Sequence, residues 1–512
     1  MSGQGPRVAL IGIDAAESTL VQSMIARGKL PTLAALHRQG SSGVLASPAD
    51  LYSGAVWPTF YSGRRPAWHG IYHNKLWQPR RMCCVVPDAR AFSARPFWEA
   101  FGTHGIRSCV VDVPLVLGGP RDVVGTYLGG WGTHDAEAVH SWPAPLARQV
   151  RREFGKPAMP REAFGAQSVE SLERAWADLR RATEQMERIG VSLLHRDDWR
   201  FFCLTFGAAH RAGHYLWDAG EARDLHEADT KRLQRLESAL EDVYATIDHA
   251  LGAMLAHCKG ARVVVFALHG MGPNTGWSEM VPAMLDARRA ALSQQPARKG
   301  ALYRARQALV TRMRPVLQHM PPSLAAQLVP LWSSRMCDWP TTPYFPLPMD
   351  LTGLLRINLR GREREGIVAP GAEYATLCAE LESFFKSLRD DKSGAPVVAE
   401  VVRAYADSSL NATHRDGQPD LILKWRETRT RDVSRLVSPE LPAFECDVPR
   451  YLASGRSGNH LPFGWFVASG PGIAAGRQLG THDIVDLAPT VRQGLGLEPE
   501  PRFHGRPLPL VS

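Results

Sequence analysis

Short apolar runs alternate with segments of helical spacing along much of the chain. Val8–Ile13, Phe201–Phe206 and Arg262–Leu268 are mainly apolar runs of strand length, and such runs are typical of strands that are buried on both faces. Ser18–Arg27 and Ala228–His257 place apolar residues at helical spacing instead. Strands that alternate with helices indicate a mainly parallel sheet with right-handed crossovers.

The same patterns extend to both ends of the chain and define the expected fold. The fold class is α/β, with a mainly parallel central sheet sandwiched by helices. Further strands are expected at Gly43–Ala46, Ser108–Val111, Leu354–Leu359, Asp420–Trp425 and Gly464–Ala468, and further helices at Thr32–Gln39, Phe97–Gly102, Glu373–Asp390 and Ile484–Gly494.

One stretch, Pro282–Pro348, breaks the alternation. It is rich in Arg, Ala, Gln and Pro and contains two helix-like segments. We therefore predict a helical insertion or cap at residues 282–348, and a single α/β catalytic core built from residues 1–281 and 349–512.

Composition narrows the class of protein. The 512 residues are 44% hydrophobic and 22% charged, which is ordinary for a globular chain. The net charge of +9 is dispersed, and without a recognisable nucleic-acid module it favours small anionic partners only weakly. No apolar run reaches the length of a membrane span, and no signal peptide is evident. The eight scattered cysteines form no disulfide framework, so we expect a reduced, cytoplasmic protein of undetermined oligomeric state.

Polar residues follow several of the predicted strands, where ligands bind in open parallel sheets. Asp14 ends the first strand, and a carboxylate there can face a cation. His210 and His214 share one helix face after another strand, a spacing that can chelate Zn²⁺. His269 follows a third strand and precedes Gly270. Each of these residues alone could equally be structural.

The block around Ser53 carries a candidate nucleophile. Ser53 precedes a helix-like segment that ends at Gly63. A hydroxyl at a helix N-terminus gains from free amide groups and the helix dipole, which suits a residue that must hold a phosphoryl group. The alternative is an ordinary N-cap serine. Arg64 and Arg65 could bind substrate phosphate or lie on the surface, and His460 taken alone is a loop residue.

Taken in order, these motifs resemble the alkaline phosphatase superfamily, in its type I phosphodiesterase/nucleotide pyrophosphatase-like branch. The resemblance rests on GIDA at 12–15, the SGAVWPTFYSGRRPAWHGIY block from Ser53, HGMG at 269–272 and the tail from ASGPGI at 468–473. It implies an α/β fold and a metal-dependent hydrolase of phosphate esters. Members of this superfamily usually hold two metal ions about 4 Å apart.

By motif position, the resemblance also implies roles for individual residues. Ser53 matches the nucleophile, and Asp14 matches the ligand of the metal that the nucleophile faces. His214, His269 and His460 match three histidine ligands of the family's two sites.

Two positions depart from the family pattern, because His210 and Leu268 stand where the family keeps aspartates. His210, His214 and His460 could still form a site with an open fourth position, suited to Zn²⁺. The second site loses a carboxylate and is weakened, although Asp135 could substitute. We expect one or two Zn²⁺ ions, with Mn²⁺ or Mg²⁺ as alternatives.

The sequence therefore predicts a hydrolase that attacks a small anionic phosphate ester with Ser53. A phosphodiester or phosphoanhydride is favoured over a monoester. One alternative is a one-metal zinc-hydroxide hydrolase of phosphate or sulfate esters without a covalent intermediate, although the sulfatase-type Cys/Ser-x-Pro-x-Arg motif is absent. The other is a degenerate, non-enzymatic member that binds a metal or another ligand.

Overall fold

The computed structural model describes most of the chain. The described residues are 5–86, 95–116, 119, 123–133, 138–163, 165–196, 198–224, 230–293, 338–404 and 416–511. None of the helices among them combines the length and apolar character that crossing a membrane requires.

A nine-stranded sheet forms the centre of the molecule, in the order β20-β2-β19-β9-β1-β8-β5-β6-β7. The strands from β9 to β6 run parallel, whereas β19 and β7 run antiparallel to their neighbours. This arrangement confirms the predicted fold class. In chain order the strands are β1 (Val8–Ile13), β2 (Ser41–Ala46), β5 (Ser108–Val111), β6 (Gly125–Gly129), β7 (His140–Trp142), β8 (Phe201–Phe206), β9 (Arg262–Ala267), β19 (Phe463–Ser469) and β20 (Gln478–Asp483).

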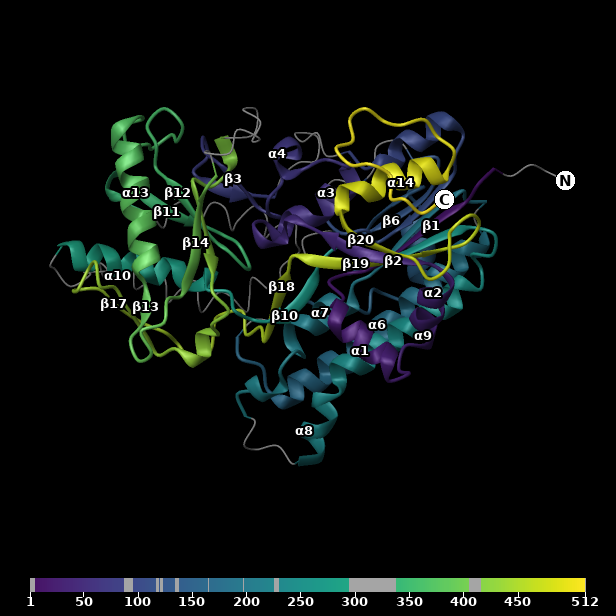
Figure 1. Ribbon diagram of the computed structural model, residues 1–512, viewed down its shortest axis with the longest axis horizontal. Coiled ribbons are helices and arrows are strands. Elements are labelled where there is room, and N and C mark those ends of the chain that lie inside the picture. Colours follow the sequence, from purple (N-terminus) through teal and green to yellow (C-terminus); the bar gives the residue numbers. More distant parts are fainter. Residues whose placement is uncertain are drawn as a thin grey trace.

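Helices cover both faces of this sheet, and the pleat of β1 shows how the core divides (Figure 1). Ala9 and Ile11 pack in the cluster that includes α1, α2, α6 and α9. Val8 and Leu10 pack in the opposite cluster with α3 and α14, because successive side chains of a strand point to opposite faces. The helices are α1 (Ser18–Ala26), α2 (Pro31–Gln39), α3 (Val56–Ser62), α4 (Pro66–His69), α5 (Leu146–Phe154), α6 (Val169–Arg196), α7 (Ala208–Tyr215), α8 (Thr230–Glu237), α9 (Ala239–Leu255) and α14 (Leu487–Gly494).

A second, antiparallel lobe lies at the other end of the molecule, in green at the left of Figure 1. Its four-stranded sheet has the order β11-β12-β15-β14, and α10 and α13 pack in the same hydrophobic cluster. A three-stranded sheet, β13-β16-β17, adjoins it. The elements are α10 (Val281–Ser293), β11 (Tyr344–Leu347), β12 (Gly353–Ile357), α13 (Ala372–Ser387), β13 (Arg389–Asp390), β14 (Val398–Arg403), β15 (Leu421–Trp425), β16 (Arg435–Val437) and β17 (Glu445–Asp447).

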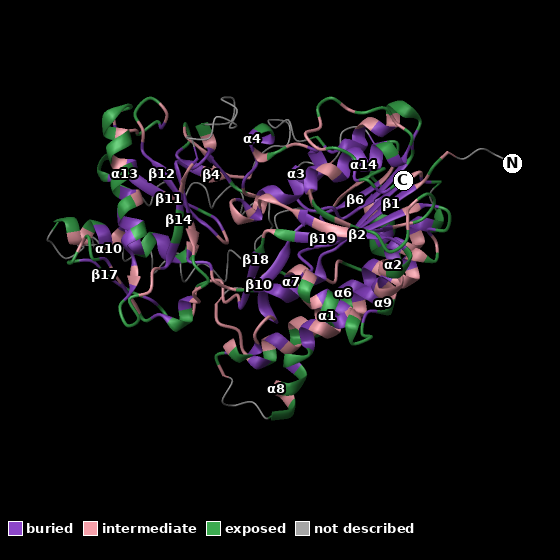
Figure 2. Cartoon of the chain, in the orientation of Figure 1, coloured by how far each residue is buried: buried purple, intermediate pink, exposed green. Residues whose placement is uncertain are grey.

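A two-stranded ribbon, β10 (Gly270–Pro273) with β18 (Gly458–Leu461), lies between the lobes. The small hairpin of β3 (Leu76–Gln78) and β4 (Cys83–Val85) completes the described sheets. Figure 2 shows that both lobes have buried interiors of their own, with the exposed residues on the outer helices.

The predicted elements are present in this structure, but several details differ. The helix expected at Phe97–Gly102 is a 3-10 helix, Phe97–His104, and the helix expected to reach Asp390 ends at Ser387. Strands β6, β7 and β20 of the central sheet were not predicted. The expected helix at Ala228–His257 is divided into α8 and α9 over its described part. The long helix α6 was not predicted. The strands and helix expected within residues 354–425 exist, but they build the antiparallel sheet and do not extend the central one.

The division into one core and a cap at 282–348 stays a prediction. Residues 294–337 lie outside the described residues. The described ends of this stretch belong to α10 and β11, which pack together within the antiparallel lobe.

Candidate active site

Three neighbouring strands of the central sheet end at the same edge. β1 lies between β8 and β9 and runs parallel to both, so Asp14, the α7 residues and His269 follow adjacent carboxyl ends. The amide of Asp14 donates to Phe206 O at 3.0 Å, which keeps the β1 and β8 ends in register. The predicted rim residues from these three segments are therefore close to one another, as the topology requires.

Helix α7 and strand β18 bring three histidines together. His210 and His214 lie one turn apart on α7, and their Nε2 atoms are 3.0 Å apart. The ring of His460 on β18 lies 5.0 Å, centroid to centroid, from each of them. One ligand atom from each residue lies within 4.8 Å of the others, as a shared metal ion requires. We call His210, His214 and His460 the three-histidine cluster.

Asp14 is buried beside this cluster. Its Oδ2 lies 3.0 Å from His210 Nδ1, and its Oδ1 accepts a hydrogen bond from Trp57 Nε1 at 2.9 Å. Burial alone would raise the pKa of the Asp14 carboxyl, but the imidazoles of His210 and His269 and the Trp57 hydrogen bond together hold it well below its usual range. Asp14 is therefore an anion that faces His210.

His269 is buried and contacts His460. The distance between His269 Nε2 and His460 Nδ1 is 3.0 Å. Burial lowers the pKa of His269 to about 4, although Asp14 partly opposes this. Burial also holds the pKa values of His214 and His460 well below the ordinary value for histidine. These three imidazoles are therefore neutral near pH 7, as metal ligands must be.

The donor set fits a zinc ion. Three imidazole ligands that leave a fourth position open are a common catalytic zinc arrangement, whereas Mg²⁺ prefers oxygen ligands. His214 Nδ1 lies 2.9 Å from Gly458 O, and such a contact orients the ring so that Nε2 faces His210. Metal binding by Asp14 and His269, predicted from the resemblance, stays a prediction.

Ser53 lies at the start of a helical segment, as predicted. It opens a short 3-10 helix, Ser53–Ala55, that runs into α3, and α3 ends at Gly63 with a left-handed φ of 65°. Among the described residues, the hydrogen-bond partner of its hydroxyl is Met349 Sδ at 3.5 Å. The structure thus places the candidate nucleophile against the antiparallel lobe, and its role as nucleophile stays a prediction.

Arg64 and Arg65 turn toward the C-terminal segment. Arg64 Nε donates to Arg502 O at 3.2 Å, and the exposed Arg65 pairs with Asp483 at 2.9 Å. No described contact joins either guanidinium to the three-histidine cluster, so their predicted role in substrate binding has no support from these contacts. Asp135, considered as a substitute ligand, lies outside the described residues.

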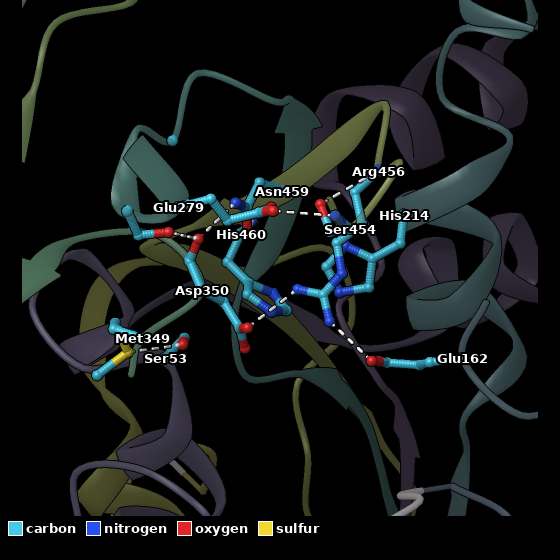
Figure 3. A network of polar contacts seen from close by, with 12 residues as sticks. Ser53, Glu162, His214, Glu279, Met349, Asp350, Ser454, Arg456, Asn459 and His460 are labelled. Atoms are coloured by element: carbon cyan, nitrogen blue, oxygen red, sulfur yellow. Dashed lines mark hydrogen bonds and ion pairs between the residues drawn. The ribbon is translucent and has the colours of Figure 1, made fainter. Parts of the chain in front are cut away.

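Polar residues that the sequence did not single out lie next to the cluster (Figure 3). Arg456 Nη1 contacts Asp350 at 3.2 Å and Arg456 Nη2 contacts Glu162 at 2.8 Å. Partial burial would raise the pKa of Asp350, but Arg456 and the nearby His73 and His460 lower it. Spacing along the chain could not reveal this group, because its members come from three distant segments.

The segment that carries Asp350 also connects the candidate nucleophile, Ser53, with the candidate metal site. Met349 contacts Ser53, and the backbone carbonyl of Asp350 accepts from Asn459 Nδ2 at 3.1 Å. Asn459 Oδ1 in turn accepts from the backbone amide of His460 at 2.9 Å. Residues 349–350 therefore lie between Ser53 and the strand that carries His460 (Figure 3).

Comparison with known proteins agrees with this geometry. The family model described as type I phosphodiesterase/nucleotide pyrophosphatase matches residues 8–328. Among solved structures, the chain is similar to an inactive variant of murine ectonucleotide pyrophosphatase/phosphodiesterase 5 in complex with AMP, at 11% identity and a TM-score of 0.50, over 97% of this chain and 96% of that one.

The chain is also similar to phosphonoacetate hydrolase from Sinorhizobium meliloti 1021 in complex with phosphonoformate. Here the identity is 14% and the TM-score 0.50, over 96% of this chain and 95% of that one. At identities this low the two structures show a shared fold. No curated protein matches the chain.

Proposed function

Because the chain belongs to the type I phosphodiesterase/nucleotide pyrophosphatase family of phosphoric ester hydrolases, we propose that it is a metal-dependent hydrolase of phosphodiesters or phosphoanhydrides. The observation that carries the proposal is the three-histidine cluster, whose ligand atoms lie within 4.8 Å of one another at the edge of the central sheet. A divalent cation held there would stabilise negative charge on the phosphoryl oxygens. A cytoplasmic location stays a prediction.

In the proposed reaction Ser53 supplies the nucleophile. Its Oγ forms a bond to phosphorus while the ester bond to the leaving group breaks, and the hydroxyl proton goes to the departing oxygen. Water then cleaves the phosphoseryl bond and releases the second product. The position of Ser53 at the start of a helical segment supports this role, since the N-terminal end of a helix favours negative charge.

The test is a comparison of wild-type protein with Ser53→Ala on aryl phosphate diesters, aryl phosphate monoesters and a nucleotide pyrophosphate, with Zn²⁺, Mn²⁺ or Mg²⁺ added. We expect diesterase or pyrophosphatase activity that falls at least 100-fold in the variant. Ser62→Ala is a matched control, because Ser62 lies in α3 and its hydroxyl donates to Pro58 O. Unchanged activity in Ser53→Ala would remove Ser53 from the role.

A second candidate mechanism is direct attack by water, with Ser53 only orienting the substrate. The observation that favours it is the hydroxyl contact, since Ser53 Oγ meets Met349 Sδ and has no described contact with the three-histidine cluster. Acid quenching during turnover, followed by mass spectrometry of the Ser53 peptide, separates the two mechanisms. A phosphoseryl adduct supports the nucleophile, whereas full turnover without an adduct supports water.

A purified protein that holds no metal and hydrolyses none of these esters would favour the remaining interpretation from the sequence, a degenerate member that only binds a ligand. Elemental analysis of protein prepared without chelators gives the metal content directly.

A further inference from the structure

Each member of the three-histidine cluster uses its second ring nitrogen to contact a neighbouring group. His210 Nδ1 faces the Asp14 carboxylate at 3.0 Å, and His214 Nδ1 faces Gly458 O at 2.9 Å. His460 Nδ1 faces His269 Nε2 at 3.0 Å. Histidines that bind metal through one nitrogen commonly donate the other N–H to a carboxylate or carbonyl in this way.

These contacts determine where the imidazole protons are. A carboxylate and a carbonyl can only accept, so the Nδ1 atoms of His210 and His214 both carry protons. An imidazole that donates through Nδ1 offers the lone pair of Nε2 to a metal ion, and these two Nε2 atoms are only 3.0 Å apart. A cation between them would relieve the repulsion of two facing lone pairs. A shared proton would bridge only His210 and His214, whereas a metal ion would also bind His460.

The same reasoning applies to His269. For His460 Nε2 to bind a metal, His460 Nδ1 must donate to His269 Nε2. His269 Nε2 faces His460 Nδ1 at 3.0 Å, and His269 Nδ1 is buried without a hydrogen-bond partner among the described residues. His269 is therefore placed to orient His460.

Asp14 likewise contacts neighbouring groups through both of its oxygens. The residue before His269 offers no replacement ligand for a second ion. One Asp14 oxygen accepts a hydrogen bond from Trp57 Nε1, and the other lies 3.0 Å from His210 Nδ1, so the carboxylate is directed at His210. Leu268 is fully buried and supplies no ligand. Among the described residues, the cluster of His210, His214 and His460 is the one group of three His, Cys, Asp or Glu side chains close enough to share an ion.

From these contacts we propose that the protein binds one divalent cation per chain at the three-histidine cluster, and that Asp14 and His269 are positioning residues for His210 and His460, not ligands of a second ion. This inference rests on the proposed function for the presence of a metal. It departs from the two-metal arrangement that the resemblance implies. Asp14 and His269 act by orienting His210 and His460.

The test is a metal count that needs no substrate. Protein is stripped with a chelator, titrated with Co²⁺ and Zn²⁺, and analysed for bound metal per chain and for the visible absorption of bound Co²⁺. We expect one ion in the wild type and none held tightly by His214→Ala. Asp14→Asn and His269→Gln should still bind one ion, with the dissociation constant raised about 10- to 100-fold and the Co²⁺ spectrum shifted.

Controls separate positioning from general damage to the fold. Glu279→Gln is matched, because Glu279 accepts from the backbone amide of Ser454 near the site and has no described contact with the three-histidine cluster. Its metal affinity should equal that of the wild type. If Asp14→Asn does not fold by circular dichroism, Trp57→Phe removes one hydrogen bond to the same carboxylate and should raise the dissociation constant by a smaller factor.

Two bound ions in the wild type, or the loss of one whole ion in Asp14→Asn or His269→Gln, would overturn the inference. Unchanged affinity and spectrum in both of these variants would also overturn it. The proposed function is tested separately. If the chain binds one ion but hydrolyses no phosphate ester, the metal assignment stands and the proposed function is wrong.

Discussion

At the scale of single residues, burial lowers the pKa values of three histidines of the site. Burial holds the pKa values of His214 and His460 well below that of an exposed histidine, and lowers the pKa of His269 to about 4. A lowered pKa keeps an imidazole neutral to a lower pH, so protons compete with the metal only in more acidic solution.

We therefore expect bound Zn²⁺ to persist when the pH falls below about 6.5, the ordinary pKa of histidine. Dialysis at a series of pH values, followed by elemental analysis, measures retention, and circular dichroism checks that the protein is still folded. A half-loss of metal close to pH 6.5 in folded protein would contradict this expectation.

Asn459 is a second residue whose effect can be predicted. It is buried, it accepts from the amide of His460, and it donates to Asn274 Oδ1 and to Asp350 O. Asn459→Ala leaves these groups without their partner, which should cost about 1–3 kcal/mol of the free energy of unfolding and weaken metal binding. Denaturant titration and metal titration measure the two effects. A loss of stability with unchanged metal affinity would show that His460 does not need this contact.

At the scale of elements, close packing of β18 against α7 places the third histidine. A Cβ on Gly458 would lie 2.0 Å from Gly213 O, far inside van der Waals contact. The close approach also brings Gly458 O to His214 Nδ1. The glycine is therefore required for both the packing and the orientation of a ligand.

Gly458→Ala should push β18 away from α7, cost about 1–3 kcal/mol in overpacking and reduce metal content. Leu461→Ala on the same strand is the control, since Leu461 is exposed and its truncation should change neither quantity much. Thermal unfolding and elemental analysis of both variants measure the outcome. Equal behaviour of the two variants would contradict the proposed packing constraint.

At the scale of the whole molecule, two lobes with separate cores contribute to one site. The lobe of the central sheet supplies Asp14, after β1, and His210, on α7, whereas the segment after β11 supplies Met349 and Asp350. The antiparallel lobe contains a fully buried ion pair, Arg356 with Glu363 at 2.6 Å. Glu363 also accepts from Trp77 Nε1 at 2.8 Å, which joins the lobe to the N-terminal half of the chain.

Glu363→Gln should destabilise the protein by about 3–5 kcal/mol, because it leaves the buried Arg356 charge uncompensated. Metal binding by the fraction that remains folded should not change, since no described contact joins Glu363 to His210, His214 or His460. Glu365→Gln is the control: Glu365 forms an exposed pair with Arg364, and such pairs contribute about 0–1 kcal/mol. Denaturant unfolding compares the variants. A small effect of Glu363→Gln would mean that water reaches Arg356.

The sequence by itself determined the strands of the central sheet and the residues that follow them. Asp14, His210 and His269 could be found because each directly follows a buried apolar strand, or begins the helix after one, and the carboxyl ends of neighbouring parallel strands meet at one edge. The i,i+4 spacing of His210 and His214 is likewise local, since one helical turn brings the two rings to the same face.

Only the tertiary structure decided how these residues pair. His269 and His460 are 191 positions apart, and their contact depends on the pairing of β10 with β18, which no local pattern encodes. The contact of Arg456 with Asp350 and the separate antiparallel sheet depend in the same way on long-range pairing. Spacing along the sequence identified which residues could be ligands. The tertiary structure decided which group each imidazole contacts, because hydrogen bonds form only between atoms that the fold brings within about 3 Å.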